Sequence, residues 1–348
     1  MNKFYSLKVK EIIRETPEAV SISFIIPEEL KETFEYKAGQ YVTFQTRMDG
    51  KEVRRSYSLC SMPGSGEFKV TVKEVPQGSF SVYANNILKA GETLEVHPPE
   101  GKFVFEPNQG GQNYAAFAAG SGITPILSII KSALHKEPKS TFVLVYGNRT
   151  VDGTIFYKDL MELQENFSQR FFVEFIYSRT REENSQFGRI ETSTVNYVLK
   201  NKFKETAFDR YYLCGPEEMI FNVAEILKDK GVNDENILFE LFTTSDTGAV
   251  ETGVEGQVQL SITVDDEESV FTMDNKKTVL EIALENDIDV PYSCQGGICS
   301  SCIARITEGT AEMRKNMILT DSEIAEGLIL TCQAQPTSDI LRVNYDDV

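Results

Sequence analysis

Short runs of β-branched and aromatic residues recur through the first part of the chain, up to residue 106. Residues 41–44 and 69–72 are examples, and Gly, Pro and Asp separate such runs from one another. Frequent turns between short strands favour antiparallel pairing and closure of the sheet. We therefore predict a small antiparallel β-barrel over residues 1–106.

Strands and helices are predicted to alternate in the middle of the chain, from residue 113 to 242. Residues 114–119 and 172–177 are apolar runs of strand length, whereas residues 126–134 carry apolar side chains at helical spacing. This alternation favours a parallel sheet covered by helices. A cluster of turn-forming residues at 107–112 marks the boundary with the predicted barrel.

The residues from 257 to 348 have the pattern of a third, α+β domain. Residues 257–264 alternate in the manner of a strand, and residues 278–286 have helical periodicity with Thr278 as a candidate N-cap. The preceding residues 243–256 are polar, rich in Gly and Thr, and without periodicity. We predict a multidomain protein in which this segment is a flexible linker.

The chain is acidic, with 53 Asp and Glu against 35 Lys and Arg and a formal net charge of −18. This balance argues against nucleic-acid binding, which depends on basic surfaces. No apolar run reaches the length of about 18 residues typical of a membrane-spanning helix, so we predict no membrane span. Residues 257–348 hold 17 acidic and 6 basic residues, a net of −11. That charge either steers this domain toward a basic partner or serves only to keep its surface solvated.

Four cysteines near the C-terminus have an informative spacing. They follow the pattern Cys-x4-Cys-x2-Cys, with a fourth Cys after twenty-nine further residues: Cys294, Cys299, Cys302 and Cys332. This is the plant-type spacing for the ligands of a [2Fe–2S] cluster. The surrounding loop is rich in Gly and Ser, which lets backbone N–H groups approach the sulfur atoms. We predict that these four residues bind such a cluster.

Zinc and disulfide bonds are the alternatives for these cysteines. Zinc usually takes paired Cys-x2-Cys sequences or histidine, and neither His97 nor His135 is near the loop in the sequence. Disulfides need an oxidising compartment, whereas residues 1–5 open no apolar signal-peptide core. We therefore expect a cytoplasmic protein. The segment 257–348 resembles a plant-type ferredoxin domain, which implies a β-grasp fold around the cluster.

A short motif in the predicted barrel resembles the flavin site of the ferredoxin-NADP reductase family. The family's Arg-x-Tyr-Ser falls on Arg55, Tyr57 and Ser58, and its Gly-x-x-Ser falls on residues 78–81. Arg can bind pyrophosphate bidentately, and amides at a helix start can bind phosphate. The alternative for Arg55 is a strand arginine in a surface ion pair. The resemblance implies an FAD site made of Arg55, Tyr57, Ser58, Val72, Lys73, Gly78, Ser79, Phe80, Ser81, Thr124 and Phe242.

A second loop of this family lies between the predicted strand 114–119 and the helix that follows. Gly120-Ser121-Gly122 allows a dinucleotide to approach the backbone, Thr124 can cap the helix, and Pro125 suits its first turn. In the reductase family, Gly-x-Gly-x-x-Pro binds the pyridine nucleotide. The resemblance implies a nucleotide site made of Gly120, Gly122, Thr124, Pro125, Arg149, Ser178, Arg179, Arg189, Cys214, Gly215, Pro216 and Met219.

The Ser178-Arg179 pair bears on the choice of nucleotide. A Ser-Arg pair at the end of a strand resembles the site that binds the 2′-phosphate of NADPH, which implies NADPH rather than NADH. An ordinary loop arginine is the alternative, because Arg181 and Arg189 are also close in sequence.

The resemblance also implies residues near the reacting atoms. Cys214 precedes Gly-Pro, where relatives place a cysteine beside the nicotinamide, and Ser58 and Glu240 are expected to approach the flavin and nicotinamide. We predict these three as catalytic groups that act by positioning. Without the resemblance, Cys214 would be interpreted as an inert buried thiol and Phe242 as a core residue.

The resemblance covers almost the whole chain in the order flavin, nucleotide, ferredoxin, and it is strongest to the reductase subunits of phenylacetyl-CoA epoxidases. It implies that electrons pass from NADPH through FAD and the [2Fe–2S] cluster to an oxygenase component, which meets the acidic ferredoxin domain. FMN is the alternative flavin. The alternative functions are an NADH-dependent reductase of a ring-hydroxylating dioxygenase or other monooxygenase, and a redox-sensing binding module.

Overall fold

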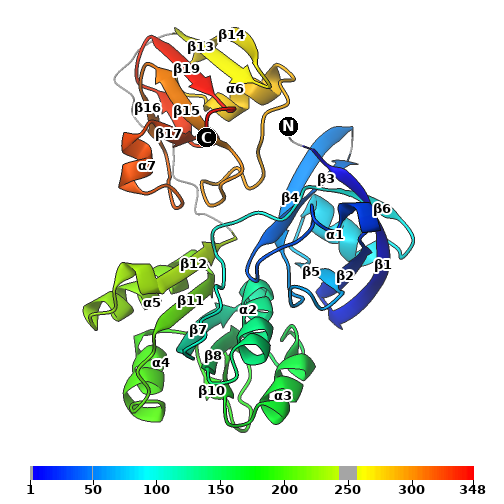
Figure 1. Cartoon of the computed structure of the whole chain (residues 1–348), viewed down its shortest axis with the longest axis vertical. Helices are drawn as coiled ribbons and strands as arrows, with labels where there is room; N and C mark the ends of the chain where they lie inside the picture. The colour runs from blue at the N-terminus through cyan, green and yellow to red at the C-terminus, as the bar shows by residue number, and fades with distance from the viewer. Residues whose placement is uncertain (1–2, 49, 243–256) are drawn as a thin grey trace. The chain divides into compact units, whose positions relative to one another are not determined.

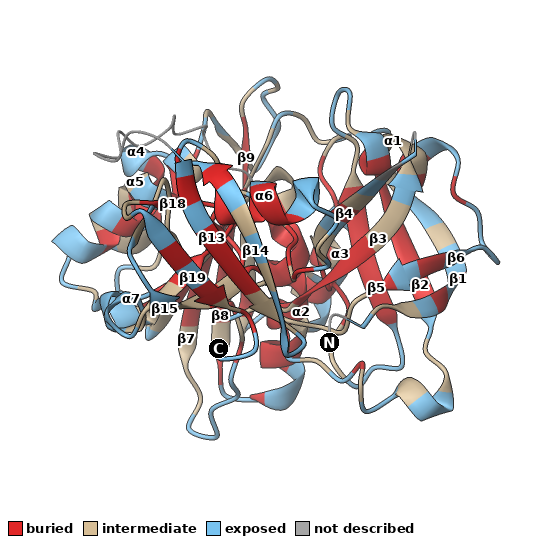
Figure 2. Ribbon diagram, turned by 90° about the horizontal axis from the view of Figure 1, so that it is seen from above, coloured by how far each residue is buried: buried red, intermediate tan, exposed pale blue. Residues whose placement is uncertain are grey.

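The computed structural model describes residues 3–48, 50–242 and 257–348. These form two compact units, one containing residues 5–53 and 57–242 and the other containing the described C-terminal residues from 257 onward. The predicted linker, residues 243–256, lies outside the described residues. In both units the buried residues are concentrated along the strands and the inner faces of the helices (Figure 2).

The first sheet of the larger unit is a barrel, as predicted. Its six strands have the order β4-β3-β6-β1-β2-β5 (Figure 1). An antiparallel bridge between Leu59 and Val70 joins the end of β4 to β5, and the Cys60 N–H donates to the Lys69 carbonyl over 2.9 Å. These contacts join the two outer strands and close the sheet. The strands are β1 (Tyr5–Thr16), β2 (Ala19–Ile25), β3 (Tyr41–Met48), β4 (Lys51–Ser58), β5 (Phe68–Lys73) and β6 (Thr93–Val96), and the helical segments are η1 (Glu28–Leu30) and α1 (Ser79–Asn86).

The second sheet of this unit is parallel, with the order β10-β9-β8-β7-β11-β12. The helices α2 and α3 cover one face and α4 and α5 the other (Figure 1). The strands are β7 (Asn113–Ala119), β8 (Thr141–Asn148), β9 (Phe171–Tyr177), β10 (Gln186–Phe187), β11 (Arg210–Gly215) and β12 (Ile237–Leu241). The helical segments are η2 (Gly120–Gly122), α2 (Ile123–Lys136), α3 (Tyr157–Asn166), α4 (Thr192–Asn196), η3 (Tyr197–Lys202), α5 (Glu217–Asp229) and η4 (Asp234–Asn236).

Strand order reverses beside β7, because the chain runs outward to β10 on one side and then returns to β11 on the other. Ligands of open parallel sheets bind at the carboxyl ends of the strands next to such a reversal. The ends of β7 and β11 are therefore the expected place for a nucleotide.

The smaller unit is a mixed five-stranded sheet with the order β14-β13-β19-β15-β17. Strand β19 lies at its centre, parallel to β13 and antiparallel to β15, which is the arrangement of a β-grasp and confirms the predicted fold. Thr278 caps α6 in a reciprocal capping box with Glu281. The elements are β13 (Gln257–Val264), β14 (Glu267–Asp274), α6 (Val279–Glu285), β15 (Ile303–Glu308), β16 (Ala311–Met313), α7 (Asp321–Ala325), β17 (Leu328–Leu330), β18 (Ala334–Pro336) and β19 (Ile340–Asn344).

None of the helices formed by the described residues has the length and apolar character needed to cross a membrane.

A buried carboxylate fixes the chain where it passes from the barrel into the parallel sheet. Glu137 is only 2% exposed, and its oxygens accept hydrogen bonds from the Asn108 N–H and the hydroxyls of Tyr114 and Ser140. Burial, followed by the Glu137 charge, raises the pKa of the Tyr114 hydroxyl, so this group stays protonated and donates. The carboxylate therefore links the segment after the barrel to both β7 and the end of α2.

We expect Glu137→Ala to destabilise the larger unit by about 3 kcal/mol, because three buried or half-buried donors lose their acceptor at once. Urea unfolding followed by circular dichroism measures this change. Glu162→Ala, on the exposed face of α3, is the control and should change the free energy of unfolding by less than about 0.5 kcal/mol. Equal effects of the two variants would contradict the assignment of Glu137 as a buried anchor.

Candidate functional site

The four predicted cluster ligands come together in the smaller unit. Cys294, Cys299 and Cys302 lie in the loop between α6 and β15, and Cys332 follows β17 directly. Pairing of β15 with β17 brings the two segments together, and the Thr331 N–H and hydroxyl both donate to the Cys302 carbonyl, over 3.0 and 2.9 Å. All four are free thiols, half-buried at Cys294 and buried at the other three.

The thiols are arranged as two pairs. A hydrogen bond from Cys299 lowers the pKa of Cys294, and one from Cys302 lowers the pKa of Cys332. Within the described ranges, no group of three or more His, Cys, Asp or Glu side chains is placed to hold a metal ion. Two neighbouring cysteine pairs instead fit a cluster of two irons with two sulfur ligands on each. The two pairs therefore match the ligand set of a [2Fe–2S] cluster.

Backbone N–H groups of the ligand loop point toward the sulfurs. The Gly296 N–H lies 3.4 Å from the Cys294 sulfur. Gly297 has a φ of +71°, and a Cβ there would lie 2.7 Å from the Lys315 carbonyl oxygen. Only glycine allows this turn, which explains the second glycine of the Gly296-Gly297 pair between the first two ligands.

The second part of the site lies at the reversal of strand order in the parallel sheet. Gly122 leads from β7 into α2, and a Cβ on it would lie 2.1 Å from the Cys214 carbonyl oxygen of β11. The Tyr146 hydroxyl donates to the Gly120 carbonyl over 2.9 Å and supports the same loop from β8. The predicted glycine loop therefore lies against the end of the neighbouring strand, where a dinucleotide can approach the backbone.

One detail of the predicted loop is wrong. Thr124 does not cap the helix, because α2 begins at Ile123 with Gly122 as its N-cap. The Thr124 hydroxyl instead donates to the Ser121 carbonyl over 3.0 Å. The first turn of α2 thus has no side-chain cap, but the Ile123 N–H already donates to the Gly120 and Ser121 carbonyls, and Pro125 has no N–H.

Three predicted catalytic residues lie together beside this loop. Ser58, the last residue of β4, donates its hydroxyl to Glu240 over 3.0 Å. Glu240 stands opposite Cys214 in the parallel pair β11 and β12. Burial, and then the Glu240 charge, raises the pKa of the Cys214 thiol well above its usual value, so Cys214 stays neutral. A hydroxyl, a carboxylate and a neutral thiol therefore meet where the barrel adjoins the carboxyl edge of the sheet.

The predicted flavin residues line the barrel side of the same region. Tyr57 packs with Phe80 and Phe44 at ring-centroid distances of 5.5 and 5.7 Å. Gly78 is the N-cap of α1, and a Cβ there would lie 2.3 Å from the Ser81 hydroxyl oxygen. The Lys73 ammonium lies 4.0 Å from the Cβ position of Gly120, so the two predicted sites adjoin each other.

The remaining predicted flavin residues differ in exposure. Arg55 is exposed on β4 and donates to the Arg54 carbonyl over 2.7 Å. Val72 is buried in the barrel, and its carbonyl accepts from the Asn85 side chain over 3.1 Å. Ser79 is exposed at the start of α1, and Phe242 is half-buried beyond β12, where it packs on the core under α2. The structure therefore shows Phe242 packed on the core, and its approach to the flavin stays a prediction.

The predicted arginines gather at the carboxyl ends of β8 and β9. The Arg179 N–H donates to the Arg149 carbonyl over 3.0 Å, and the Ser178 N–H donates to the Asn148 carbonyl over 3.0 Å. The Arg181 guanidinium stacks on the Phe187 ring at 4.4 Å. Arg189 is exposed after β10. The structure therefore brings together Arg149, Ser178 and Arg179, while Arg181 already has an aromatic partner.

Pro216 is the N-cap of α5, and Met219 is buried in its first turn. Gly215 needs to be small, because a Cβ on it would lie 2.8 Å from the Met219 methyl group and 3.2 Å from Ala119. The sequence after Cys214 thus keeps β11, β7 and α5 close together. Pro125 occupies the first turn of α2, as predicted.

Sequence reasoning missed two residues of the site. Phe44 stacks on Phe80 at a ring-centroid distance of 5.4 Å and also packs on Tyr57. In the sequence, its position in a strand indicates only a barrel residue. Gln333 directs its side-chain amide at the ligand loop of the cysteines, and no spacing rule points to it. The only hint in the sequence is that Gln333 directly follows the predicted ligand Cys332.

Three protein families match consecutive parts of the chain. Residues 6–105 match the oxidoreductase FAD-binding domain, residues 117–225 the oxidoreductase NAD-binding domain, and residues 262–337 the 2Fe-2S iron-sulfur cluster binding domain. The order is the one predicted from the motifs.

Curated relatives match over their full length. The chain is 37% identical to one of the subunits of 1,2-phenylacetyl-CoA epoxidase of Escherichia coli K12, over 99% of both chains. It is 33% identical to the ferredoxin reductase component of 3-ketosteroid-9-alpha-monooxygenase from Rhodococcus rhodochrous, over 97% of this chain and 96% of the other.

Two solved structures share the fold of nearly the whole chain. Phthalate dioxygenase reductase, a modular structure for electron transfer from pyridine nucleotides to [2Fe–2S], has a TM-score of 0.63 at 22% identity and covers 98% of both chains. An intact type IV self-sufficient cytochrome P450 monooxygenase has a TM-score of 0.70 at 20% identity. The match covers 98% of this chain but only 41% of that longer protein.

Proposed function

Since this chain belongs to the family of reductase components that combine FAD-binding, NAD-binding and [2Fe–2S] domains and serve oxygenases, we propose that it transfers electrons from NADPH to a phenylacetyl-CoA epoxidase. The observation that carries the redox part is the meeting of Ser58, Glu240 and Cys214 beside the glycine loop. The choice of partner rests on the similarity to the Escherichia coli epoxidase component.

The residues at this meeting point position the reactants. FAD and the nucleotide supply the hydride chemistry themselves. The Ser58 hydroxyl is held by Glu240 and so has a fixed direction at the end of β4. Cys214 is fully buried and neutral, so it adds no charge to the site and acts on it through packing. When the two cofactors bind, these three side chains would help to hold the reacting rings in register.

The two cysteine pairs of the smaller unit provide the last step of the proposed electron path. A [2Fe–2S] cluster accepts and releases one electron at a time, and Cys294, Cys299, Cys302 and Cys332 would hold it. The acidic surface of residues 257–348 supports docking of a partner with a basic patch through this domain. Free thiols throughout support a reducing compartment such as the cytoplasm.

An anaerobic titration of the purified protein with NADPH, followed by absorbance and EPR, tests the redox part. We expect a flavin band that bleaches together with the appearance of a one-electron cluster signal. Bleaching without a cluster signal would refute the cluster assignment or the coupling of the two centres. Absence of steady NADPH turnover with an artificial acceptor would favour the redox-sensing module instead.

The partner is tested separately, by mixing the reduced protein with isolated oxygenase components. We expect product formation with the oxygenase of phenylacetyl-CoA epoxidase and at least about tenfold less with a ring-hydroxylating dioxygenase, because partner choice depends on complementary surface charge and shape. Equal activity with both would overturn the assignment of the partner and leave the redox function intact.

Arg179→Ala is expected to lower kcat/KM for NADPH by about 10- to 100-fold, which is the value of a charge-assisted hydrogen bond to phosphate. The value for NADH should stay within about twofold, since NADH lacks the 2′-phosphate. Steady-state kinetics with ferricyanide as acceptor measure both. Arg181→Ala is the matched control, because that side chain stacks on Phe187. A parallel loss with both nucleotides would show that Arg179 does not select NADPH.

A further inference from the structure

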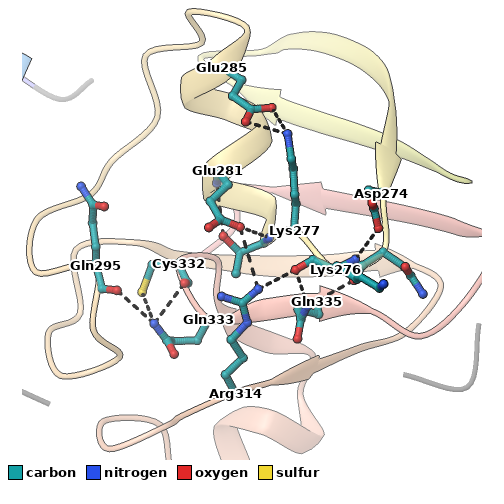
Figure 3. Close-up of polar contacts among 12 residues, drawn as sticks. Asp274, Lys276, Lys277, Glu281, Glu285, Gln295, Arg314, Cys332, Gln333 and Gln335 are labelled. Atoms are coloured by element: carbon teal, nitrogen blue, oxygen red, sulfur yellow. Dashed lines mark hydrogen bonds and ion pairs between the residues drawn. The ribbon is translucent and has the colours of Figure 1, made fainter. Parts of the chain in front are cut away.

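A side-chain amide lies against Cys332, one of the predicted cluster ligands, and against the loop that holds the other three (Figure 3). Gln333 directly follows Cys332 and is 9% exposed. Its Nε2 lies 3.0 Å from the Gln295 carbonyl oxygen, 3.0 Å from the Cys332 carbonyl oxygen and 3.8 Å from the Cys332 sulfur. One buried amide thus touches the ligand loop and the fourth ligand together.

The orientation of this amide follows from its neighbours. All three contacting atoms are acceptors, two carbonyl oxygens and a sulfur, so the NH2 end and not the oxygen faces them. The NH2 group has two hydrogens for three acceptors. The nitrogen can therefore donate one hydrogen to the Gln295 carbonyl and share the other between the carbonyl and the sulfur of Cys332.

The contact with Gln295 holds an unfavourable backbone conformation. Gln295 has a φ of 54°, a left-handed value that non-glycine residues seldom adopt. Gln295 immediately follows Cys294, so its conformation sets the direction in which the ligand loop leaves the first cysteine. The Gln333 hydrogen bond fixes the carbonyl of that turn.

We propose that Gln333 is a positioning residue for the cluster, which ties the ligand loop to Cys332 and makes the cluster easier to reduce. Reduction adds one electron and therefore negative charge to the iron–sulfur core. An N–H directed at a ligand sulfur stabilises the more negative state and raises the reduction potential. The inference rests on the cluster assigned to Cys294, Cys299, Cys302 and Cys332.

The chain offers a matched control two residues further on. Gln335 is also a buried glutamine amide, and its Nε2 donates to the carbonyls of Lys276 and Asn275 over 2.6 and 3.3 Å (Figure 3). Those contacts hold the segment before α6, and the same amide group is directed away from the sulfurs. Gln335→Met therefore removes a comparable buried N–H donor, but not one that contacts a cluster ligand.

The experiment compares wild type, Gln333→Met and Gln335→Met as full-length proteins. Methionine has nearly the length of glutamine but no N–H donor. The reduction potential of the cluster is measured by titration with dithionite, monitored by EPR, and cluster loss is followed by release of iron to a chelator. We expect Gln333→Met to lower the equilibrium constant for reduction by about three- to tenfold, where tenfold is 59 mV for one electron. Iron release should be faster than in wild type.

Gln335→Met should keep the wild-type potential. An unchanged potential in Gln333→Met, or the same decrease in both variants, would overturn the inference. If Gln333→Met does not assemble a cluster, Gln333→Asn replaces it in the same comparison, because its amide is too short to reach Gln295 and Cys332. Absence of a cluster in the wild-type protein would instead refute the proposed function.

Discussion

Replacing Cys332 with alanine is expected to abolish electron delivery to an oxygenase. The substitution removes one of the four sulfurs and leaves one iron with a single cysteine. The loss of electron delivery should exceed the roughly 10- to 100-fold loss that follows when a residue hydrogen-bonded to a metal ligand is removed. Reduction of ferricyanide by NADPH should stay within about twofold, because the Ser58, Cys214 and Glu240 site lies in the other unit.

EPR of the reduced protein and product formation by the oxygenase measure this prediction. Cys60→Ala is the control, because Cys60 is a buried thiol of the barrel whose pKa burial raises to about 11. It should keep the cluster signal. A Cys332→Ala protein that retains a wild-type EPR signal and full transfer would show that the four-cysteine assignment is wrong.

Gly122→Ala is expected to destabilise the larger unit by about 3 kcal/mol and to raise KM for NADPH. Gly122 has a φ of −60°, so alanine meets no backbone strain and would ordinarily favour the start of a helix. The Cβ, however, would lie 2.1 Å from the Cys214 carbonyl oxygen. Because that oxygen belongs to the backbone of β11, relief requires the glycine loop and the neighbouring strand to move apart.

Urea unfolding followed by flavin release and steady-state kinetics test this second prediction. Gly153→Ala is the control, since a Cβ there would meet the Thr150 hydroxyl oxygen at 3.3 Å as its nearest atom. It should change the free energy of unfolding by less than about 0.5 kcal/mol. A stable Gly122→Ala protein with unchanged KM would show that this close approach is not needed for nucleotide binding.

Local patterns in the sequence were enough to predict several elements. Strand β13 has the predicted bounds of residues 257–264, and Thr278 caps α6 as expected. Both depend on side-chain alternation and neighbouring residues only. Thr124 shows where such local rules fail, because its hydroxyl donates to the Ser121 carbonyl inside a short 3-10 turn that the sequence did not reveal.

Contacts between distant segments could not be predicted in detail. The motif resemblance placed Ser58 and Glu240 in one site, but their hydrogen bond joins residues 182 positions apart and depends on how the barrel packs against the sheet. Gln333 is another case, because only the folded loop shows that its amide faces Gln295 and Cys332. Side-chain direction, and not residue type, decides both contacts.

The central place of β19 in the smaller sheet has a consequence for biosynthesis. The ribosome makes β13, β14, β15 and β17 first, and these strands form two pairs with nothing between them until β19 emerges. All four cysteines are therefore translated before the strand that joins the two halves of their support. We therefore expect iron and sulfide to be inserted only after β19, which ends at residue 344, has left the ribosomal tunnel. Cluster loading then follows translation of this domain and does not accompany it.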